Sequence, residues 1–363
     1  MLQHLILVIN PGSTSTKLAL YRNTEQVNYV NLHHSNEELA PYNTIVDQRA
    51  FREELIERWL GEIGVPLSSL TTLVGRGGLL APIPGGTYRV NETMVRQLEQ
   101  AQYGSHASNL GALLAYDLSV RLNIPAYIVD PVVVDELMPV ARKTGLPQIM
   151  RRSIFHALNH KANAKRLAVE LGRRYDELNL IVAHLGGGIS VGAHARGQVV
   201  DVNNALSGDG PFSPERSGSI SPRVLIDYYF HTGMTKAEIM RKLIGNSGLV
   251  AHLGTNDGRE IERRIEEGDL ASRLCLEAMA YQVAKEIGKM SAVLSGEVDR
   301  IILTGGLAYS ALLVSEISKR VEYIAPVRVL PGENELEALA FGAWRVISGE
   351  EQARDYGAEG VNR

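Results

Sequence analysis

Two arginines of this sequence stand among small residues, where a long charged side chain cannot pack into a core. Arg76 lies in Gly75-Arg-Gly-Gly78, directly after an apolar run, and Arg216 lies in Pro214-Glu-Arg-Ser-Gly218. A planar guanidinium binds a carboxylate or a phosphate through two parallel hydrogen bonds. The alternative for each is a solvated loop arginine, but the loose glycine neighbours favour a role in binding an anion.

Polar tips rich in glycine or hydroxyl residues could hold phosphate groups. The first reads Asn10-Pro-Gly-Ser-Thr-Ser-Thr-Lys17, and backbone N–H groups and hydroxyls that meet in one concavity suit phosphate oxygens. It is not a Walker loop, because no Gly-Lys pair precedes a Ser or Thr. A plain hairpin turn is the alternative for any one tip. Four tips together favour a nucleoside triphosphate: Asn10–Lys17, His184–Gly188, Ser217–Ser219 and Thr304–Gly306.

Acidic and histidine side chains accompany these tips. Asp130 ends an apolar strand before a proline, and Glu333 and Glu335 follow another strand. Carboxylates at such positions hold Mg²⁺ waters or a neighbouring arginine, and helix capping is the alternative. His156 and His160 are four residues apart, so one helix face could present both, and this spacing can bind zinc. No third ligand is evident nearby, so we interpret them as neutral donors to a phosphoryl group or substrate, with a structural role open for His160.

The order of apolar runs predicts a duplicated α/β fold. Apolar Leu5–Ile9 and the alternating segments Lys17–Tyr21 and Val27–Leu32 indicate a three-stranded antiparallel meander. The same pattern recurs roughly 175 residues later, from Leu178 to Val202. Chance is the alternative, but the matching glycine-rich tips favour duplication. Elsewhere we expect helices over Arg49–Ile63, Ser108–Leu122, Pro222–Phe230, Lys236–Ile244, Leu270–Leu294 and Glu335–Ile347, and strands over Thr71–Val74, Ala126–Val129, Arg300–Leu303 and Val327–Leu330.

Bulk composition indicates a globular protein of two domains. The chain has 363 residues, of which 45% are hydrophobic and 21% charged, and two domains are expected at this length. A net charge of −4 and a pI near 6.2 argue against nucleic-acid or membrane-surface binding. The single cysteine, Cys275, fits a reducing compartment. No bilayer-length apolar run and no secretory signal are apparent, so we expect a cytoplasmic location.

These motifs, taken in order, resemble those of the acetate and butyrate kinases, the acetokinase family. The resemblance spans essentially the whole chain, and its combination of motifs is highly specific. It is carried by Asn10-Pro-Gly-Ser-Thr-Ser-Thr-Lys17, Val74-Gly-Arg76-Gly-Gly, Gly104-Ser-His106-Ala-Ser-Asn109, Val129-Asp130, Met138-Pro139, Phe155-His156, His160-Lys161, His184-Leu-Gly-Gly-Gly188, Arg216-Ser-Gly218, Ser247-Gly-Leu, Asp257-Gly-Arg259, Thr304-Gly-Gly306 and Pro331-Gly-Glu-Asn-Glu335-Leu.

The resemblance implies a duplicated actin-like (ribonuclease H-like) phosphotransferase fold, with two lobes around a nucleotide cleft. The expected N-terminal lobe, residues 1–148, lies on the acid and phosphoryl side, and a C-terminal helix over about 338–363 packs back on it. The expected nucleotide-binding lobe comprises residues 149–337, with a hinge near Leu146–Arg152. The resemblance further implies ATP or ADP and Mg²⁺ as cofactors, a short-chain fatty acid as substrate, and a homodimer or higher homo-oligomer.

Within this family the departures from the acetate kinase pattern resemble butyrate kinase. They are the Pro-Gly-Ser-Thr-Ser-Thr tip, the reduced Gly75-Arg-Gly-Gly78 strand end, Pro131-Val-Val-Val134 and Thr304-Gly-Gly-Leu-Ala-Tyr309. The expected reaction is butyrate plus ATP giving butyryl phosphate plus ADP, reversibly. Kinases for isobutyrate, propionate or acetate are the alternatives. A sugar kinase, with Asp130 as its base, and a non-catalytic ATP-binding scaffold are less favoured.

The resemblance also implies roles for individual residues. Arg76 is expected to clamp the acid, with His106 and Phe155 near it, while Arg216, His156, Asn10 and Asp130 assist phosphoryl transfer. Asn10, Asp130 and Glu335 are expected on the metal side, with Glu333 as the alternative to Glu335. The expected nucleotide contacts are Ser13, Ser15, Lys17, His184, Gly186, Gly187 and Gly188 at the phosphates, and Asp257, Arg259, Gly305 and Gly306 at the adenosine.

Overall fold

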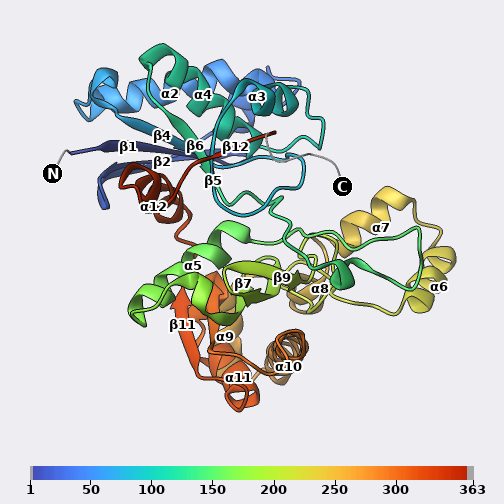
Figure 1. Ribbon diagram of the computed structural model, residues 1–363. Helices are drawn as coiled ribbons and strands as arrows, with labels where there is room; N and C mark the ends of the chain where they lie inside the picture. Colours follow the sequence, from blue (N-terminus) through green and yellow to red (C-terminus); the bar gives the residue numbers. More distant parts are fainter. Residues whose placement is uncertain (1–2, 358–363) are drawn as a thin grey trace. The chain divides into compact units, whose positions relative to one another are not determined.

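The computed structural model describes residues 3–357 and divides them into two compact units (Figure 1). The first comprises the described residues up to Val134 together with those from Asn334 onward. The second is Asp135–Glu333. We expected a division near residue 148, with a hinge at Leu146–Arg152. The chain instead passes between the units at Val134–Asp135, and it returns at Glu333–Asn334.

The first unit is built on a seven-stranded sheet in the order β12-β5-β6-β4-β1-β2-β3. β1 is antiparallel to β2 and parallel to β4, so it lies inside the sheet, and six of its seven residues are buried. A central strand covered on both faces is apolar throughout, as the run Leu5–Ile9 predicted. The strands are β1 (Leu5–Pro11), β2 (Ser15–Arg22), β3 (Glu25–His33), β4 (Thr72–Gly75), β5 (Thr87–Arg89), β6 (Ala126–Val129) and β12 (Arg354–Asp355).

Helices cover both faces of this sheet. In Figure 1, α2, α3 and α4 lie on one face and α12 lies on the other, where it packs against β1, β6 and β4. Gly342 of α12 sits directly on Val129 of β6, where a Cβ would overlap the valine side chain. The helices are α1 (Asn36–Leu39), α2 (Arg49–Glu62), α3 (Glu92–Glu99), α4 (Asn109–Leu122) and α12 (Glu335–Ile347).

The second unit repeats the core of the first. Its five-stranded sheet has the order β11-β10-β7-β8-β9, with β7–β8 and β8–β9 antiparallel and β7–β10 and β10–β11 parallel. These directions match β6-β4-β1-β2-β3, and both meanders carry a register shift between their second and third strands. The predicted duplication is therefore confirmed. The strands are β7 (Asn179–Leu185), β8 (Ile189–Ala195), β9 (Gln198–Val202), β10 (Arg300–Gly305) and β11 (Val327–Pro331).

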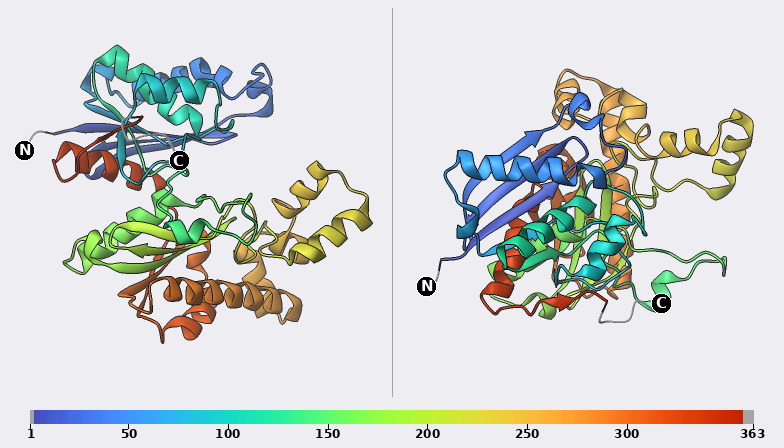
Figure 2. Two further views of the ribbon diagram at one scale, coloured as in Figure 1. Left: turned by 45° about the vertical axis from the view of Figure 1, so that its right-hand side comes forward. Right: turned by 90° about the horizontal axis from the view of Figure 1, so that it is seen from above.

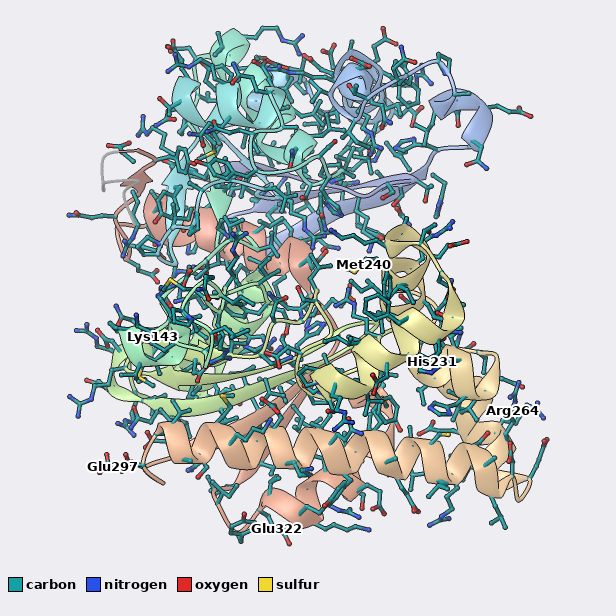
Figure 3. The ribbon with its side chains drawn as sticks, turned by 90° about the vertical axis from the view of Figure 1, so that its right-hand side faces the viewer. Lys143, His231, Met240, Arg264, Glu297 and Glu322 are labelled. Atoms are coloured by element: carbon teal, nitrogen blue, oxygen red, sulfur yellow. The ribbon has the colours of Figure 1, made fainter. Side chains whose placement is uncertain are left out.

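Helix α5 packs on one face of the second sheet, and α10 packs on the other face. α11 packs against α10. α6 and α7 form a hairpin that projects from this unit (Figure 2), and His231 and Met240 of the hairpin are exposed (Figure 3). Thr235 and Glu238 form the predicted capping box. The helices are α5 (Ala157–Glu170), α6 (Pro222–Thr232), α7 (Lys236–Leu243), α8 (Gly248–Leu253), α9 (Gly258–Glu266), α10 (Leu270–Val293) and α11 (Ala311–Val321).

The C-terminal helix is shorter than the span of about 338–363 that we expected. It ends at Ile347, and the chain turns at Gly349 and adds β12 beside β5. Gly349 has φ of 81°, a conformation that stops a helix. Residues 358–363 of the expected span lie outside the described part of the chain. Within residues 3–357, none of the helices combines the length and apolarity that a membrane crossing requires.

Candidate functional site

A buried arginine holds the tip between β1 and β2. Arg52 of α2 is fully buried, and its Nη1 donates to the carbonyl oxygens of Gly12 and Ser15, at 2.9 Å each. Its Nη2 donates to the carbonyl oxygen of Ser13 at 3.2 Å. Burial lowers the pKa of Arg52 to about 10, so the guanidinium stays charged at neutral pH. The tip therefore rests on a fixed positive charge.

The opposite face of this tip presents the predicted phosphate-binding side chains. Asn10 pairs with Lys17 across the β1–β2 ladder, so the two side chains share one face, and Ser15 lies on it two residues before Lys17. Thr16 points to the other face, where its hydroxyl contacts Arg52. Ser13 is exposed at the turn itself. The alternation of β2 thus separates the side chains predicted to bind phosphate from Thr16, which contacts the arginine that holds the tip.

Arg76, Asn10 and Glu335 form one connected group in the first unit. Arg76 follows β4, and its Nη2 lies 2.9 Å from Oε1 of Glu335 while its Nη1 donates to Oε2 at 3.1 Å. Asn10 Nδ2 donates to the same Oε2 at 2.7 Å. Arg76 Nη1 also lies 3.3 Å from Asn10 Oδ1. The guanidinium of Arg76 is thus arranged to bind a carboxylate with two hydrogen bonds.

His106 and Asp130 have different surroundings. The backbone N–H of Ser108 donates to His106 Nδ1 at 3.2 Å, so the neutral ring carries its proton on Nε2. The packing around this ring and the nearby Arg76 lower the pKa of His106, which favours that neutral form. Asp130 is 2% exposed, has φ of 37°, and accepts a hydrogen bond from the Gly86 N–H at 2.7 Å. Its carboxylate holds the 84–87 loop against the end of β6.

The first unit offers oxygen ligands that suit Mg²⁺. In the described part of the chain no three His, Cys, Asp or Glu side chains are grouped to hold a metal. Mg²⁺ needs no such group, because it retains waters and binds one or two carboxylates plus phosphate oxygens. The Glu335 side chain is 20% exposed and adjoins the Asn10 amide, so this pair fits the ion. Asp130 fits it less well, because it is buried and engaged with Gly86.

In the second unit, His156 and His184 stack with ring centroids 3.9 Å apart. His184 is the last residue but one of β7, as Asn10 is of β1, and its Nδ1 lies 2.9 Å from Asn159 Oδ1. The Asn159 amide nitrogen donates to the carbonyl oxygens of Gly332 and Glu333, so its oxygen faces His184. Burial lowers the pKa of His184 to about 3, so the ring is neutral. His156 is the residue before α5, not on a face of that helix as we expected.

Arg216 and the 184–188 loop are in direct contact. A Cβ on Gly188 would overlap the Arg216 guanidinium, so any larger residue there would displace this side chain. Arg216 Nη1 also donates to the carbonyl oxygen of Ala205, and Ser213 Oγ donates to the carbonyl oxygen of Gly187 at 2.6 Å. Burial lowers the pKa of Arg216. The structure therefore brings together Arg216 and the 184–188 loop, two features that the sequence suggested separately.

The residues predicted for adenosine lie at two places. Gly305 ends β10 with φ of 90°, where a Cβ would overlap the carbonyl group of Leu185, and Gly306 faces open space. Asp257 caps α9 by accepting from the N–H of Arg259 at 3.0 Å. The Arg259 side chain is 94% exposed. Gly258, between them, lies next to Leu307 of the turn that follows Gly306.

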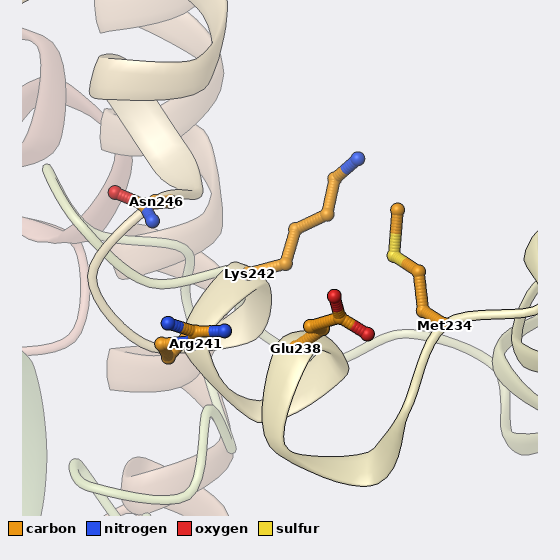
Figure 4. Close-up of a pocket in the computed structure, with 5 residues that line it drawn as sticks. All are labelled: Met234, Glu238, Arg241, Lys242 and Asn246. Carbon is orange, nitrogen blue, oxygen red and sulfur yellow. The ribbon is translucent and has the colours of Figure 1, made fainter.

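Phe155, which we expected near the acid, is buried, and one surface pocket involves none of the expected residues. Phe155 is 2% exposed and meets His160 edge-on at 5.1 Å, so its ring supports that histidine from within the core. A surface pocket on α7 is lined by Met234, Glu238, Arg241, Lys242 and Asn246 (Figure 4). None of these five residues was expected to bind a ligand.

The fold and family follow from comparison with known proteins. The model of the acetokinase family matches residues 136–353, which is more than half of the chain. Acetate kinase from Porphyromonas gingivalis is 20% identical with a TM-score of 0.78, over 94% of this chain and 99% of that one. A propionate kinase from Francisella tularensis is 20% identical with a TM-score of 0.72, over 93% and 98%.

Acetate kinase from Entamoeba histolytica is 18% identical with a TM-score of 0.71, again over 93% and 98% of the two chains. These similarities show the duplicated actin-like phosphotransferase fold that the resemblance implied, and the repeated meander agrees with it. The matched family model extends through His156, His160, the 184–188 loop, Arg216 and Glu335. The chain therefore belongs to the acetokinase family of carboxylate phosphotransferases.

Proposed function

We propose that this chain is a butyrate kinase, which transfers the γ-phosphoryl group of ATP to butyrate and releases ADP, reversibly. The observation that carries the proposal is a carboxylate-binding arginine beside an apolar segment. Arg76 holds the Glu335 carboxylate through two hydrogen bonds, and a Cβ on the adjacent Gly77 would collide with Pro131. Pro131 begins Pro131-Val-Val-Val134, which can contact a short alkyl chain.

The chemistry requires positioning and charge stabilisation. A carboxylate is already ionised at neutral pH, so no strong base is needed. One carboxylate oxygen attacks the γ-phosphorus, and the bond from that phosphorus to the departing ADP oxygen breaks. Arg76 holds the acid with Nε2–H of His106 near it, while Arg216 and His156 donate to the transferred group. Mg²⁺, held by Glu335 and Asn10, would neutralise phosphate charge.

We assign the acid to the first unit and the nucleotide to the second. We assign Asn10, Ser13, Ser15 and Lys17, at the tip that Arg52 holds, to phosphate binding. The second unit supplies the 184–188 loop to the phosphates and the Gly305–Gly306 turn to the adenosine, with Asp257 and Arg259 beside it. We give Asp130 and Phe155 supporting roles, because both side chains are almost fully buried.

A series of kcat/KM values over linear and branched acids tests this proposal, with hydroxylamine trapping of the acyl phosphate. We expect the highest value for butyrate or isobutyrate. Acetate should fall about 10- to 200-fold or more below it, since a missing methylene costs roughly 1–3 kcal/mol. An acetate optimum would overturn the butyrate assignment, and absence of hydroxamate would overturn acid kinase activity.

We further propose a cytoplasmic homodimer. The single cysteine, Cys275, is free, which fits a reducing compartment. Light scattering coupled to gel filtration should give twice the chain mass of 39.7 kDa. A monomer at micromolar concentration would contradict the dimer.

A further inference from the structure

A chain of hydrogen bonds crosses the second unit and ends at His156. Tyr175 OH lies 2.7 Å from His194 Nδ1, and His194 Nε2 lies 3.3 Å from His160 Nδ1. His160 Nε2 is 2.9 Å from Ser190 Oγ, which is 2.8 Å from His156 Nδ1. We call Tyr175, His194, His160 and Ser190 the relay. Its hydrogen bonds lead to a fifth side chain, that of His156.

The interior of the relay is closed to solvent, whereas its ends are not. Ser190, His160 and His194 are fully buried, but Tyr175 and His156 are partly exposed. Burial is the main cause that holds the pKa of both His160 and His194 well below the usual value. Both rings are therefore neutral, and each carries one N–H and one acceptor nitrogen.

One proton per ring couples the orientations of all the hydrogen bonds. Only one of the two facing nitrogens, His160 Nδ1 and His194 Nε2, can carry a proton if the contact is a hydrogen bond. If Tyr175 donates to His194, the proton of each successive histidine must lie on Nε2, and Ser190 donates to His156. If the relay runs the other way, all three histidines carry the proton on Nδ1.

We propose that the relay is a positioning device that fixes His156 as the Nε2–H tautomer, a neutral hydrogen-bond donor. Tyr175 sets the direction of the hydrogen bonds. Its neutral phenol donates readily to His194 Nδ1, whereas the phenol oxygen is a poor acceptor for an N–H of neutral His194. The reverse direction would leave a lone pair on His156 Nε2, which repels phosphate oxygens. The consequence for catalysis rests on the proposed function, whereas the tautomer itself does not.

The tautomer can be measured directly in the intact protein. Long-range ¹H–¹⁵N correlation of ¹⁵N-histidine-labelled protein distinguishes a protonated ring nitrogen from a bare one, and His156→Gln assigns the His156 signals. We expect His156, His160 and His194 all to carry the proton on Nε2. A proton on Nδ1 of His156 would overturn the inference, whatever the enzyme's activity proves to be.

Tyr175→Phe tests the contribution of the relay. Loss of one neutral hydrogen bond predicts a kcat about two- to tenfold lower, with KM values unchanged and the Nδ1–H form of His156 becoming detectable. Ser190→Ala, which disconnects His156 from the relay, should lower kcat at least as much. The matched control is Tyr323→Phe, because Tyr323 is 82% exposed in the same unit and should change neither quantity.

A double-mutant cycle separates positioning from general destabilisation. In the His156→Gln background, Tyr175→Phe should have no further effect on kcat, because the histidine whose tautomer Tyr175 controls is absent. An equal decrease in both backgrounds would mean that Tyr175 serves only the fold. If acid kinase activity is absent altogether, the proposed function fails, while the NMR result still decides the tautomer.

Discussion

Glu335 and Arg76, which lie 259 residues apart in sequence, form an ion pair with a 2.9 Å contact. Glu335 begins α12 and Arg76 follows β4, and α12 packs against that strand. The proposed reaction gives these residues different ligands, Mg²⁺ to Glu335 and the acid carboxylate to Arg76. The two side chains neutralise each other, and under the proposed function Glu335 holds the position on Arg76 that the acid carboxylate would take.

Glu335→Gln tests this competition. The amide retains the shape of the carboxylate but neither its charge nor its affinity for a metal, so the Mg²⁺ concentration for half-maximal rate should rise at least about tenfold. KM for the acid should stay equal or fall, because Arg76 loses its internal partner. Initial rates at varied Mg²⁺ and at varied acid concentration measure the two effects, and an unchanged Mg²⁺ requirement would remove Glu335 from the metal side.

Arg76→Ala should lower kcat/KM for the acid by about 10²–10³-fold, because a charged donor to the reacting carboxylate is lost. Arg76→Lys should recover little activity, since an ammonium group lacks the two-pronged geometry. Arg89→Ala, at an exposed position on β5 in the same unit, is the control and should leave the rate unchanged. Near wild-type kcat/KM in Arg76→Ala would contradict the assignment.

Arg52→Met should affect both stability and nucleotide binding. The change leaves carbonyl groups of the 12–15 tip without their donor, at a cost of roughly 1–3 kcal/mol in the free energy of unfolding. KM for ATP should also rise, because the tip loses both its shape and its positive charge. Arg58→Met, on the exposed side of the same helix, is the matched control for urea denaturation and kinetics. Equal behaviour of the two variants would show that Arg52 does not hold the tip.

Gly188→Ala should lower kcat by at least about tenfold, because the new methyl group occupies the place of the Arg216 guanidinium. The fold should survive, since the guanidinium can shift. Gly288→Ala, inside α10 with open space around it, provides the control and should stabilise the protein by about 0.5–1 kcal/mol. A fully active Gly188→Ala enzyme would show that this position of Arg216 is not needed.

Stability should decrease as pH falls below about 6.5. Burial lowers the pKa of His184 to about 3 and that of His34 to about 4. Below pH 6.5 these two histidines bind protons in the unfolded chain. In the folded protein they stay neutral until the pH approaches their lowered pKa values. The free energy of unfolding therefore falls by up to about 1.4 kcal/mol per pH unit for each such histidine. Urea denaturation near pH 7 and pH 5 measures this effect. The free energy of unfolding of His34→Gln should fall less between the two pH values than that of the wild-type protein, and an equal fall would contradict this cause.

Sequence patterns determined the strands and helices that have a strong period. The meanders, α10 and α12 occupy the predicted segments within a few residues, because each buries a face whose spacing is visible in the sequence. The elements that escaped prediction include helices α3, α8, α9 and α11 and the short strands β5 and β12. β5 has only three residues, and β12 has two, so neither shows a period. Arg52 was not singled out from the sequence, although it shares the buried face of α2 with Ile56 and Trp59.

The sequence by itself determined the residue types at the site, through short motifs at the ends of strands. Only the tertiary structure decided which of them meet, because contacts over 259 residues depend on how the sheet and helices pack. Packing paired Arg76 with Glu335, placed Arg216 against Gly188, and buried Phe155 behind His160. It also connected Tyr175 to His156 through buried rings. The donor role that we propose for His156 depends on the partner of its other nitrogen, Ser190, which lies on β8.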